Sequence, residues 1–330
     1  VAEYIQVPDV EFTKEYADVI KLVTIAADVE GGMEYIERIT NETDIICSLG
    51  HTCASYDIAK EAFNPERIGN TTKEIMDLCD IITVSTEELR DLYHKYYNIP
   101  LNKFIVIQNY LPRWWIGDSF NLGRQMYQFS QQRKRPTLAF CCSVNHFDVK
   151  NVNGGQDDFS HLIPWIIKNI DKYQFVFVGG VPVQLQEYVK TGKIQYQAPS
   201  DIFNYPHQMQ LRKIDLLCAP LIDNAFNRCK SNIKFLEFSA LGIPMCGQNI
   251  CTYNKYTKLV FDTGEDIDKL CEQLFFSKNS EEYYKEIIVQ QRNIIDNPSP
   301  LSATGYWLEA NIKPYYELYS IPQKTMTIDL

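Results

Sequence analysis

Short apolar runs and amphipathic segments alternate along the last two thirds of the chain. The apolar runs predict strands at 137–144, 173–180, 192–197, 214–221, 242–249 and 258–261. The amphipathic segments predict helices at 158–171 and 202–212. Strands that alternate with helices favour parallel βαβ units. The pattern therefore predicts one doubly wound α/β domain.

The first third of the chain follows this pattern less regularly. Apolar runs predict strands at 43–49, 79–85 and 103–111, and the helix-like segment TTKEIMDL lies between the first two. This part is short for a Rossmann-like domain, so we expect its opening strands to be missing or rebuilt. We predict an N-terminal domain over 1–115, a C-terminal domain over 116–301, and a helix over 302–330 that can pack back on the N-terminal domain.

Size and composition indicate a soluble globular protein. A chain of 330 residues is long enough for two domains, and 45% hydrophobic with 22% charged residues is ordinary for globular proteins. No apolar run approaches the roughly 20 residues that span a bilayer, so we expect no membrane span. No signal peptide is visible, although the chain begins without Met and a leader is not excluded. We expect a cytoplasmic protein.

The ten cysteines are scattered, and several lie inside apolar runs such as LAFCCSV and IDLLCAPL. Cysteine in such runs behaves as a small buried hydrophobe. Adjacent Cys141 and Cys142 should point to opposite faces of a strand. The chain has no paired C-x-x-C motifs of the kind that hold a structural zinc. Reduced cysteines are therefore expected.

A net charge of −10 argues against broad nonspecific binding to nucleic acid, but it does not exclude a local basic groove. One stretch, DNAFNRCKSNIKFLEFSALGIP at 223–244, concentrates basic and amide side chains. These are Asn224, Asn227, Arg228, Lys230, Asn232 and Lys234.

This stretch follows a predicted strand, at the end where open parallel sheets bind ligands. A helix should begin there with Ser231 or Asn232 as its N-cap, and its free N–H groups favour an anion such as phosphate. Glu237, one turn deeper, suits the hydroxyl groups of a ribose. The arrangement indicates a nucleoside diphosphate. The alternative is a surface helix with a basic first turn, which costs stability unless an anion offsets it.

The loop after the first strand of the C-terminal domain is the other candidate part of the site. Asn145, His146 and Lys150 can donate hydrogen bonds, and Gly154 and Gly155 allow close approach of the backbone. The alternative is a flexible surface loop. His146 has one carboxylate close by in sequence, and two ligands do not make a metal site.

The motif E-x-x-A-L-G-I-P at 237–244 resembles the donor-binding helix of GT-B glycosyltransferases, especially the retaining enzymes of family 4. Glu237 matches the second residue of their Glu-x7-Glu pattern, which holds the ribose. The first position is Cys229, so the sequence departs from the pattern there, and Asn227, Lys230 or Ser231 are candidates for that role.

Two further pieces extend the resemblance over residues 79–265. CDIITVSTEELRDLY and FIVIQNYLPRWW resemble the end of the N-terminal domain and the linker of these enzymes, with Asn109 at the family's linker asparagine. SVNHFDVKNVNGGQDDFSHLI, together with DNAFNRCKSNIK, is most similar to glycosyltransferases of tailed bacteriophages.

The resemblance implies a GT-B architecture, in which two Rossmann-like doubly wound domains face a cleft, with a short N-terminal domain. It implies a nucleoside diphosphate sugar as donor and no bound metal or other cofactor. Arg228, Lys230 and Lys234 would stabilise the leaving phosphate. A retaining reaction is expected, whereas an inverting one needs a protein base, for which SLGHTCASYD offers His51 and Asp57. A structural role for His51 is the alternative.

The base of the donor should lie near the loop 197–203. The phage resemblance suggests a hydroxymethylated base in DNA as acceptor and the host cytoplasm as location. A glycan, a lipid or a protein is the other choice of acceptor. Two other functions stay open: a sugar-nucleotide epimerase of the same fold, and a degenerate protein that binds a nucleotide or a partner without turnover.

Overall fold

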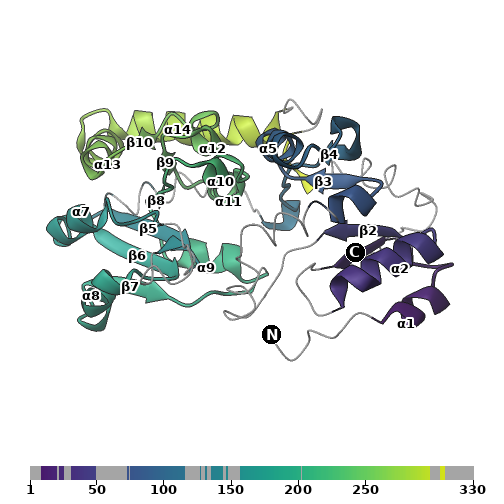
Figure 1. Cartoon of the computed structure of the whole chain (residues 1–330). Coiled ribbons are helices and arrows are strands. Elements are labelled where there is room, and N and C mark those ends of the chain that lie inside the picture. The colour runs from purple at the N-terminus through teal and green to yellow at the C-terminus, as the bar shows by residue number, and fades with distance from the viewer. Residues whose placement is uncertain are drawn as a thin grey trace. The chain divides into compact units, whose positions relative to one another are not determined.

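The chain divides into two compact units. Unit 1 comprises residues 1–108 and 313–330, and unit 2 comprises residues 109–312. Their elements are labelled in Figure 1. The structure is a computed structural model that describes residues 9–20, 22–25, 31–49, 73, 75–115, 127, 131, 135–143, 146–147, 157–201, 203–297 and 305–308.

Unit 2 is built on a sheet of six parallel strands in the order β10-β9-β8-β5-β6-β7. Its strands are β5 (Thr137–Cys142), β6 (Gln174–Gly179), β7 (Ile194–Gln197), β8 (Leu216–Ala219), β9 (Met245–Gln248) and β10 (Val260–Phe261). In register, Leu138 pairs with Phe175 on one side and Leu216 on the other. Every residue of β5 and β8 is buried. The six strands coincide with the six apolar runs, so these predictions are confirmed.

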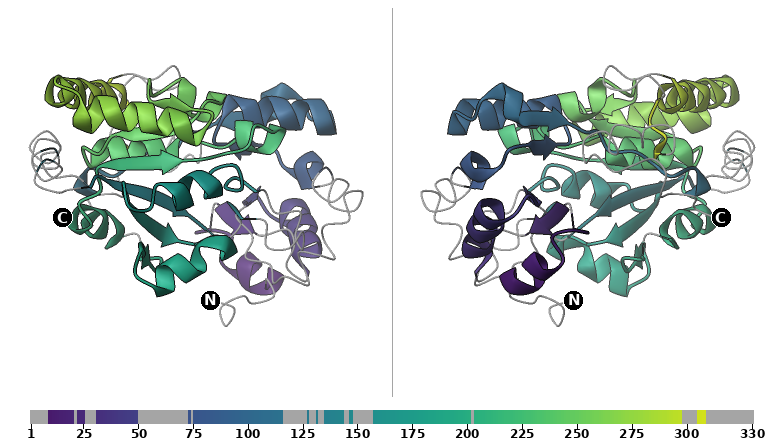
Figure 2. Two further views of the ribbon diagram at one scale, coloured as in Figure 1. Left: turned by 90° about the vertical axis from the view of Figure 1, so that its left-hand side faces the viewer. Right: turned by 90° about the vertical axis from the view of Figure 1, so that its right-hand side faces the viewer.

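Helices cover both faces of this sheet (Figure 2). Leu138, Phe140 and Cys142 face a core shared with α7 (Ile163–Lys168), α13 (Gly264–Cys271), a π-helical turn (Glu272–Phe276) and α14 (Ser280–Asp296). Ala139 and Cys141 face a second core, to which α9 (Tyr205–Leu211) and α11 (Ile233–Ala240) contribute. Cys141 and Cys142 therefore point to opposite faces, as predicted. The shorter helices are Val183–Leu185 (3-10), α8 (Gln186–Lys190), α10 (Ala225–Arg228) and α12 (Cys251–Asn254).

The chain beyond α14 packs against the first residues of unit 2. Leu111 and Trp307 form a parallel bridge, with hydrogen bonds of 2.9 Å on either side. The Trp307 indole is buried and donates to Asp296 at 2.8 Å, and the guanidinium groups of Arg113 and Arg292 lie 5.2 and 5.3 Å from its ring centroid. Within residues 305–308, the aromatic C-terminal segment thus belongs to the core of unit 2.

Unit 1 contains two pairs of parallel strands. β1 (Leu22–Ile25) pairs with β2 (Ile46–Leu49), and β3 (Ile82–Val84) pairs with β4 (Phe104–Val106). The labelled helices are α1 (Val10–Glu15), α2 (Gly32–Glu42) and α5 (Glu87–Tyr97), and residues 75–78 are also helical. A 3-10 turn lies at Leu101–Lys103, and another, in unit 2, at Arg113–Trp115. The apolar runs predict β2, β3 and β4 but not β1. We expected the opening strands of this domain to be missing or rebuilt, but β1 is a regular parallel strand paired with β2.

Of the eight cysteines whose side chains the structure describes, all but Cys251 are buried. Cys218 and Cys246 lie on neighbouring strands with their sulfur atoms 3.5 Å apart. Burial raises the pKa of Cys141 and of Cys142 to about 12. Cysteine serves here as a small apolar side chain, as expected from the sequence.

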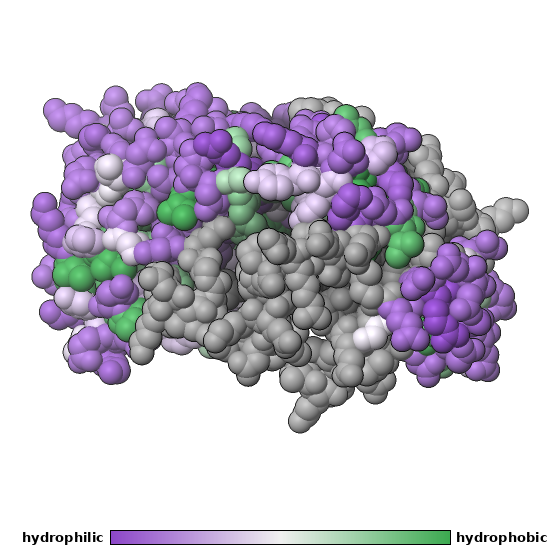
Figure 3. All heavy atoms as spheres, in the orientation of Figure 1, coloured by the Kyte–Doolittle hydropathy of each residue, from purple (hydrophilic) through white to green (hydrophobic). Residues whose placement is uncertain are grey.

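The surface of the described residues is mostly hydrophilic on the face that Figure 3 shows, and hydrophobic residues appear there in small groups. Within the described parts of the chain, no helix is both long enough and apolar enough to span a bilayer.

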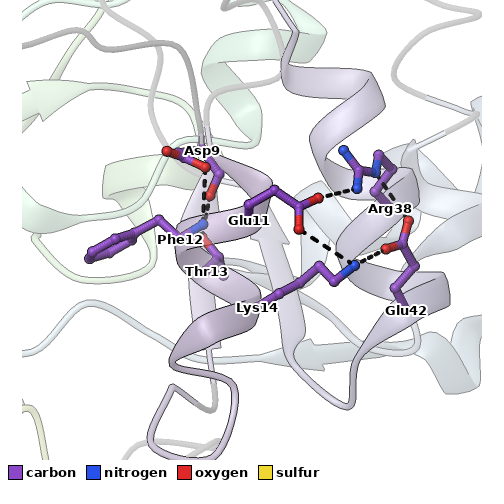
Figure 4. Close-up of polar contacts among 7 residues, drawn as sticks. All are labelled: Asp9, Glu11, Phe12, Thr13, Lys14, Arg38 and Glu42. Atoms are coloured by element: carbon purple, nitrogen blue, oxygen red, sulfur yellow. Dashed lines mark hydrogen bonds and ion pairs between the residues drawn. The ribbon is translucent and has the colours of Figure 1, made fainter.

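Four charged residues join α1 to α2 in unit 1 (Figure 4). Glu42 forms ion pairs with Lys14 and Arg38, and Arg38 also pairs with Glu11. Hydrogen bonds from Arg38 and then from Lys14 lower the pKa of the Glu42 carboxyl to about 2. All four side chains remain in contact with water.

We expect Glu42→Gln to lower the thermal unfolding midpoint slightly at low ionic strength. Exposed ion pairs contribute little, and salt screens them, so the difference from wild type should shrink in about 1 M NaCl. Because the folded pKa of Glu42 lies below its ordinary 4.5, its contribution is present above pH 4.5 and is lost as the pH falls through about 2. Circular dichroism melts at two salt concentrations measure this, with Glu37→Gln in α2 as control, since Glu37 is exposed and pairs with no described basic residue. A salt-independent difference would contradict it.

Candidate functional site

Two polar loops leave the sheet of unit 2 at its topological switch point. β5 is the first strand of the sheet and pairs with β6 on one side and β8 on the other. The chain moves outward through β6 and β7 before it returns to β8, so the carboxyl ends of β5 and β8 are neighbours. Open α/β sheets bind ligands at such a point. Both sequence-predicted parts of the site lie on these loops.

The loop after β8 is shaped by asparagines. Asn224 caps α10, and its side chain accepts a hydrogen bond from the Asn227 N–H at 2.8 Å. Asn232 is the N-cap of α11, as predicted, but its side chain makes no capping hydrogen bond. Asn232 is buried, and its Nδ2 has no partner among the described atoms. The start of α11 therefore keeps unused hydrogen-bond donors.

α11 buries its apolar side chains and leaves one polar face. Phe235, Leu236 and Phe238 are fully buried in the core of unit 2. Lys234 and Glu237 are partly exposed, and a spacing of three residues places them on one face of the helix. The packing of the phenylalanines thus fixes where this lysine and this carboxyl group lie.

Lys230 and Lys234 bring positive charge to this place without a carboxylate partner. No acidic side chain in the described part of the chain forms an ion pair with either lysine. The Lys230 ammonium lies 5.0 Å from the centroid of the Phe226 ring. Burial lowers the pKa of Lys230 most, Asp158 acts in the opposite direction, and Lys234 lowers it further. Two lysines that repel each other in a half-buried place favour the binding of an anion.

Asp158 holds the two loops together. Its side chain is fully buried and accepts hydrogen bonds from the Ile222 N–H at 2.7 Å and from Asn227 Nδ2 at 2.9 Å. Its other oxygen contacts His146 Nδ1 at 2.7 Å. Ile222 and Asn227 belong to the loop after β8, and His146 to the loop after β5. One carboxylate therefore positions side chains from both loops.

The sequence did not single out Asp158. The preceding residue has the same side chain and caps the turn, since Asp157 accepts from the N–H groups of Phe159 and Ser160 at 3.2 and 2.8 Å. Two adjacent aspartates at the start of a helix are a weak signal for a functional residue. One of them is accounted for by capping, and the sequence does not indicate what the other contacts.

Glu237 is a second acidic residue of the site, in addition to Asp158. Burial raises the pKa of its carboxyl to about 7, and the charge of Lys234 acts in the opposite direction. No described residue donates a hydrogen bond to it. A carboxyl group in this state can accept hydrogen bonds from hydroxyl groups that a ligand brings.

Two other predicted residues are engaged within the protein. Arg228 is exposed and forms a two-point ion pair with Asp223, with N–O distances of 2.5 and 2.7 Å. Ser231 accepts a hydrogen bond from Asn109 Nδ2 at 2.6 Å. The linker asparagine thus fixes the loop next to Lys230, and this contact was not expected from the sequence.

The other predicted residues lie outside the described part of the chain. They are His51, Asp57, Asn145, Lys150, Gly154 and Gly155. The structure brings together His146, Asn227, Lys230, Lys234 and Glu237, with Ser231 and Asn232 beside them.

A cavity of about 780 Å³ opens at the carboxyl end of β7. It is lined by residues 196–201 and by Gln208, Leu211 and Arg212 of α9 and its C-cap. The Arg212 guanidinium donates to the Gln197 side chain, and Gln197 contacts Gln208. The cavity coincides with the loop where the sequence placed a nucleotide base.

No protein-family model matches the chain. TuaH of Bacillus subtilis, named as a teichuronic acid biosynthesis glycosyltransferase, is 30% identical over 132 residues, which are 37% of this chain and 32% of TuaH. The match spans about a third of that relative's length.

Solved structures match over nearly the whole chain. Anabaena Alr3699/HepE in complex with UDP and glucose matches with a TM-score of 0.61 and 10% identity, over 94% of this chain and 81% of its own. A glycosyltransferase from Rickettsia africae matches with a TM-score of 0.54 and 13% identity, over 96% and 80%. The chain has a GT-B-like fold. At these identities the likeness concerns the fold alone.

Proposed function

We propose that the protein is a glycosyltransferase that moves a sugar from a nucleoside diphosphate sugar to an acceptor hydroxyl. The observation that carries this proposal is the pair of lysines Lys230 and Lys234, which form no ion pair with any described residue, at the switch point of a GT-B-like fold. The relative TuaH, by its name, supports the same activity, whereas the named relatives do not favour an epimerase.

Each part of the donor has a matching place in unit 2. The diphosphate would bind Lys230, Lys234 and the N-terminus of α11, where N–H groups and the helix dipole favour an anion. The ribose hydroxyls would donate to Glu237, and the base would enter the cavity after β7. Uridine is the proposed base, because Alr3699/HepE binds UDP and UDP-glucose.

The reaction develops negative charge on the leaving group. The bond between the sugar C1 and the β-phosphate oxygen breaks with its electron pair on that oxygen, while the acceptor oxygen bonds to C1. Lys230 and Lys234 stabilise the charge as it develops. We propose a retaining reaction in which the leaving phosphate takes the acceptor's proton. The two lysines would supply the charge, and we propose that no metal is needed.

Two observations bear on the choice of acceptor. The phage-like sequence pieces favour a hydroxymethylated base in DNA, and the name of TuaH favours an acceptor in teichuronic acid biosynthesis. A net charge of −10 would repel the DNA backbone, which weighs against DNA. A cytoplasmic location stays a prediction.

The test is donor turnover. We expect the protein to release UDP from at least one UDP-sugar, faster in the presence of the correct acceptor, as measured by chromatography of the nucleotides. The anomeric configuration of the product, by NMR, tests the retaining reaction. Appearance of an epimeric UDP-sugar without UDP release would instead establish an epimerase. Binding of nucleotide sugars without any release, across a panel of acceptors, would identify a degenerate binding protein.

A further inference from the structure

His146 is held in one orientation by Asp158. One oxygen of the Asp158 carboxylate accepts hydrogen bonds from the Ile222 N–H and from Asn227 Nδ2. The other oxygen lies 2.7 Å from His146 Nδ1. A carboxylate in this setting is an acceptor, so Nδ1 of His146 is the donor. Its second nitrogen, Nε2, then carries a proton only when the ring is positively charged.

Without a ligand, the surroundings of His146 favour the neutral ring. Burial lowers the pKa of His146 most, the hydrogen bond to Asp158 raises it, and the charges of Lys234 and Lys230 lower it. Glu237 lies on the same face of α11 as Lys234. Two neighbours in sequence, Asp148 and Lys150, lie outside the described residues. The two lysines thus discourage a third positive charge.

A bound diphosphate reverses this balance, since its charge offsets that of the lysines. We propose that His146 takes up a proton as the nucleoside diphosphate binds and that its Nε2–H donates a hydrogen bond to a phosphate oxygen. This inference rests on the proposed function. The lysines would supply positive charge, and His146 would make the affinity depend on pH.

The sign follows from linkage. Binding that raises the pKa of a group is strongest below the pKa of the complex and weakens as the pH rises through it. UDP affinity should therefore fall by up to about tenfold for each pH unit between the two pKa values of His146. Proton release from UDP itself and from Glu237 also changes the affinity with pH. This contribution is the same in wild type and in a variant that lacks His146.

The test is NMR titration of the histidine ring resonances of the full chain, with and without UDP. The chain has five histidines, so the signal of His146 can be assigned by its loss in His146→Gln. We expect its titration midpoint to move to higher pH when UDP is bound. If UDP binds and that midpoint stays in place, the inference is wrong while the proposed function stands. If neither UDP nor pyrophosphate binds, both are wrong.

Calorimetry separates the proton-linked role from a structural one. At about pH 6, His146→Gln should bind UDP about tenfold more weakly than wild type, whereas at about pH 9, where the ring is neutral in both states, the affinities should agree. His207→Gln, on the exposed side of α9, is the matched control. An equal loss at both pH values would mean that His146 only supports the loop and would overturn the inference.

Discussion

Replacing Lys234 by alanine should weaken UDP binding by about 10- to 100-fold, because one hydrogen bond between charged groups contributes about 1.5–3 kcal/mol. Lys230→Ala should have an effect of the same order. Neither lysine forms an ion pair within the described part of the chain, so neither variant should lose stability through a broken pair. The loss of affinity then reports the site itself.

Titration calorimetry with UDP measures this effect, and a thermal melt without ligand checks the fold. Lys190→Ala is a matched control, since Lys190 is an exposed lysine of α8 whose ammonium lies 3.5 Å from Glu187. Unchanged UDP affinity in both Lys230→Ala and Lys234→Ala would remove the main support for the proposed function.

Glu237→Gln should stabilise the folded protein above pH 7 and weaken nucleotide binding at the same time. The folded pKa of Glu237 is raised from its ordinary 4.5 to about 7. For a raised pKa, the contribution to stability is fully present below pH 4.5 and is lost as the pH rises through about 7. A shift of this size corresponds at most to about 3 kcal/mol. Glutamine does not ionise, so the variant keeps that stability at high pH.

Urea unfolding at about pH 5 and about pH 8 measures the first effect, and the variant should gain on wild type only at the higher pH. The second effect needs two ligands. UDP affinity should fall because glutamine is a weaker acceptor for ribose hydroxyls, while pyrophosphate, which lacks ribose, should bind as before. A stability gain of equal size at both pH values would show that Glu237 is not the titrating group.

The sheet of unit 2 could be predicted from the sequence because parallel strands buried on both faces are continuous apolar runs. TLAFCC, for example, is buried at every position. β1 was missed although Leu22–Ile25 lies in the apolar run VIKLVTIAA, so its pattern gave no physical reason to leave it out. The GT-B-like fold was predicted from the resemblance around Glu237 and confirmed by structures at 10% and 13% identity.

The site could be predicted only in part. Lys230, Lys234 and Glu237 stand out because they lie close together in sequence. Asp158 acts through residues that are 12, 64 and 69 positions away, and no local pattern records such contacts. The pairing of Arg228 with Asp223 was equally hidden, because a charged residue does not reveal from sequence whether its partner is a ligand or a neighbour.

Asp158 also has a consequence for the entropy of ligand binding. A loop that is disordered before a ligand arrives must lose its conformational freedom during binding, and that loss weakens the affinity. The loop after β8 is tied to the loop after β5 through Asp158 and to the linker through Asn109. The loop after β8 therefore loses its conformational freedom when the chain folds. When a diphosphate binds, the entropy that is lost is mainly that of the diphosphate itself.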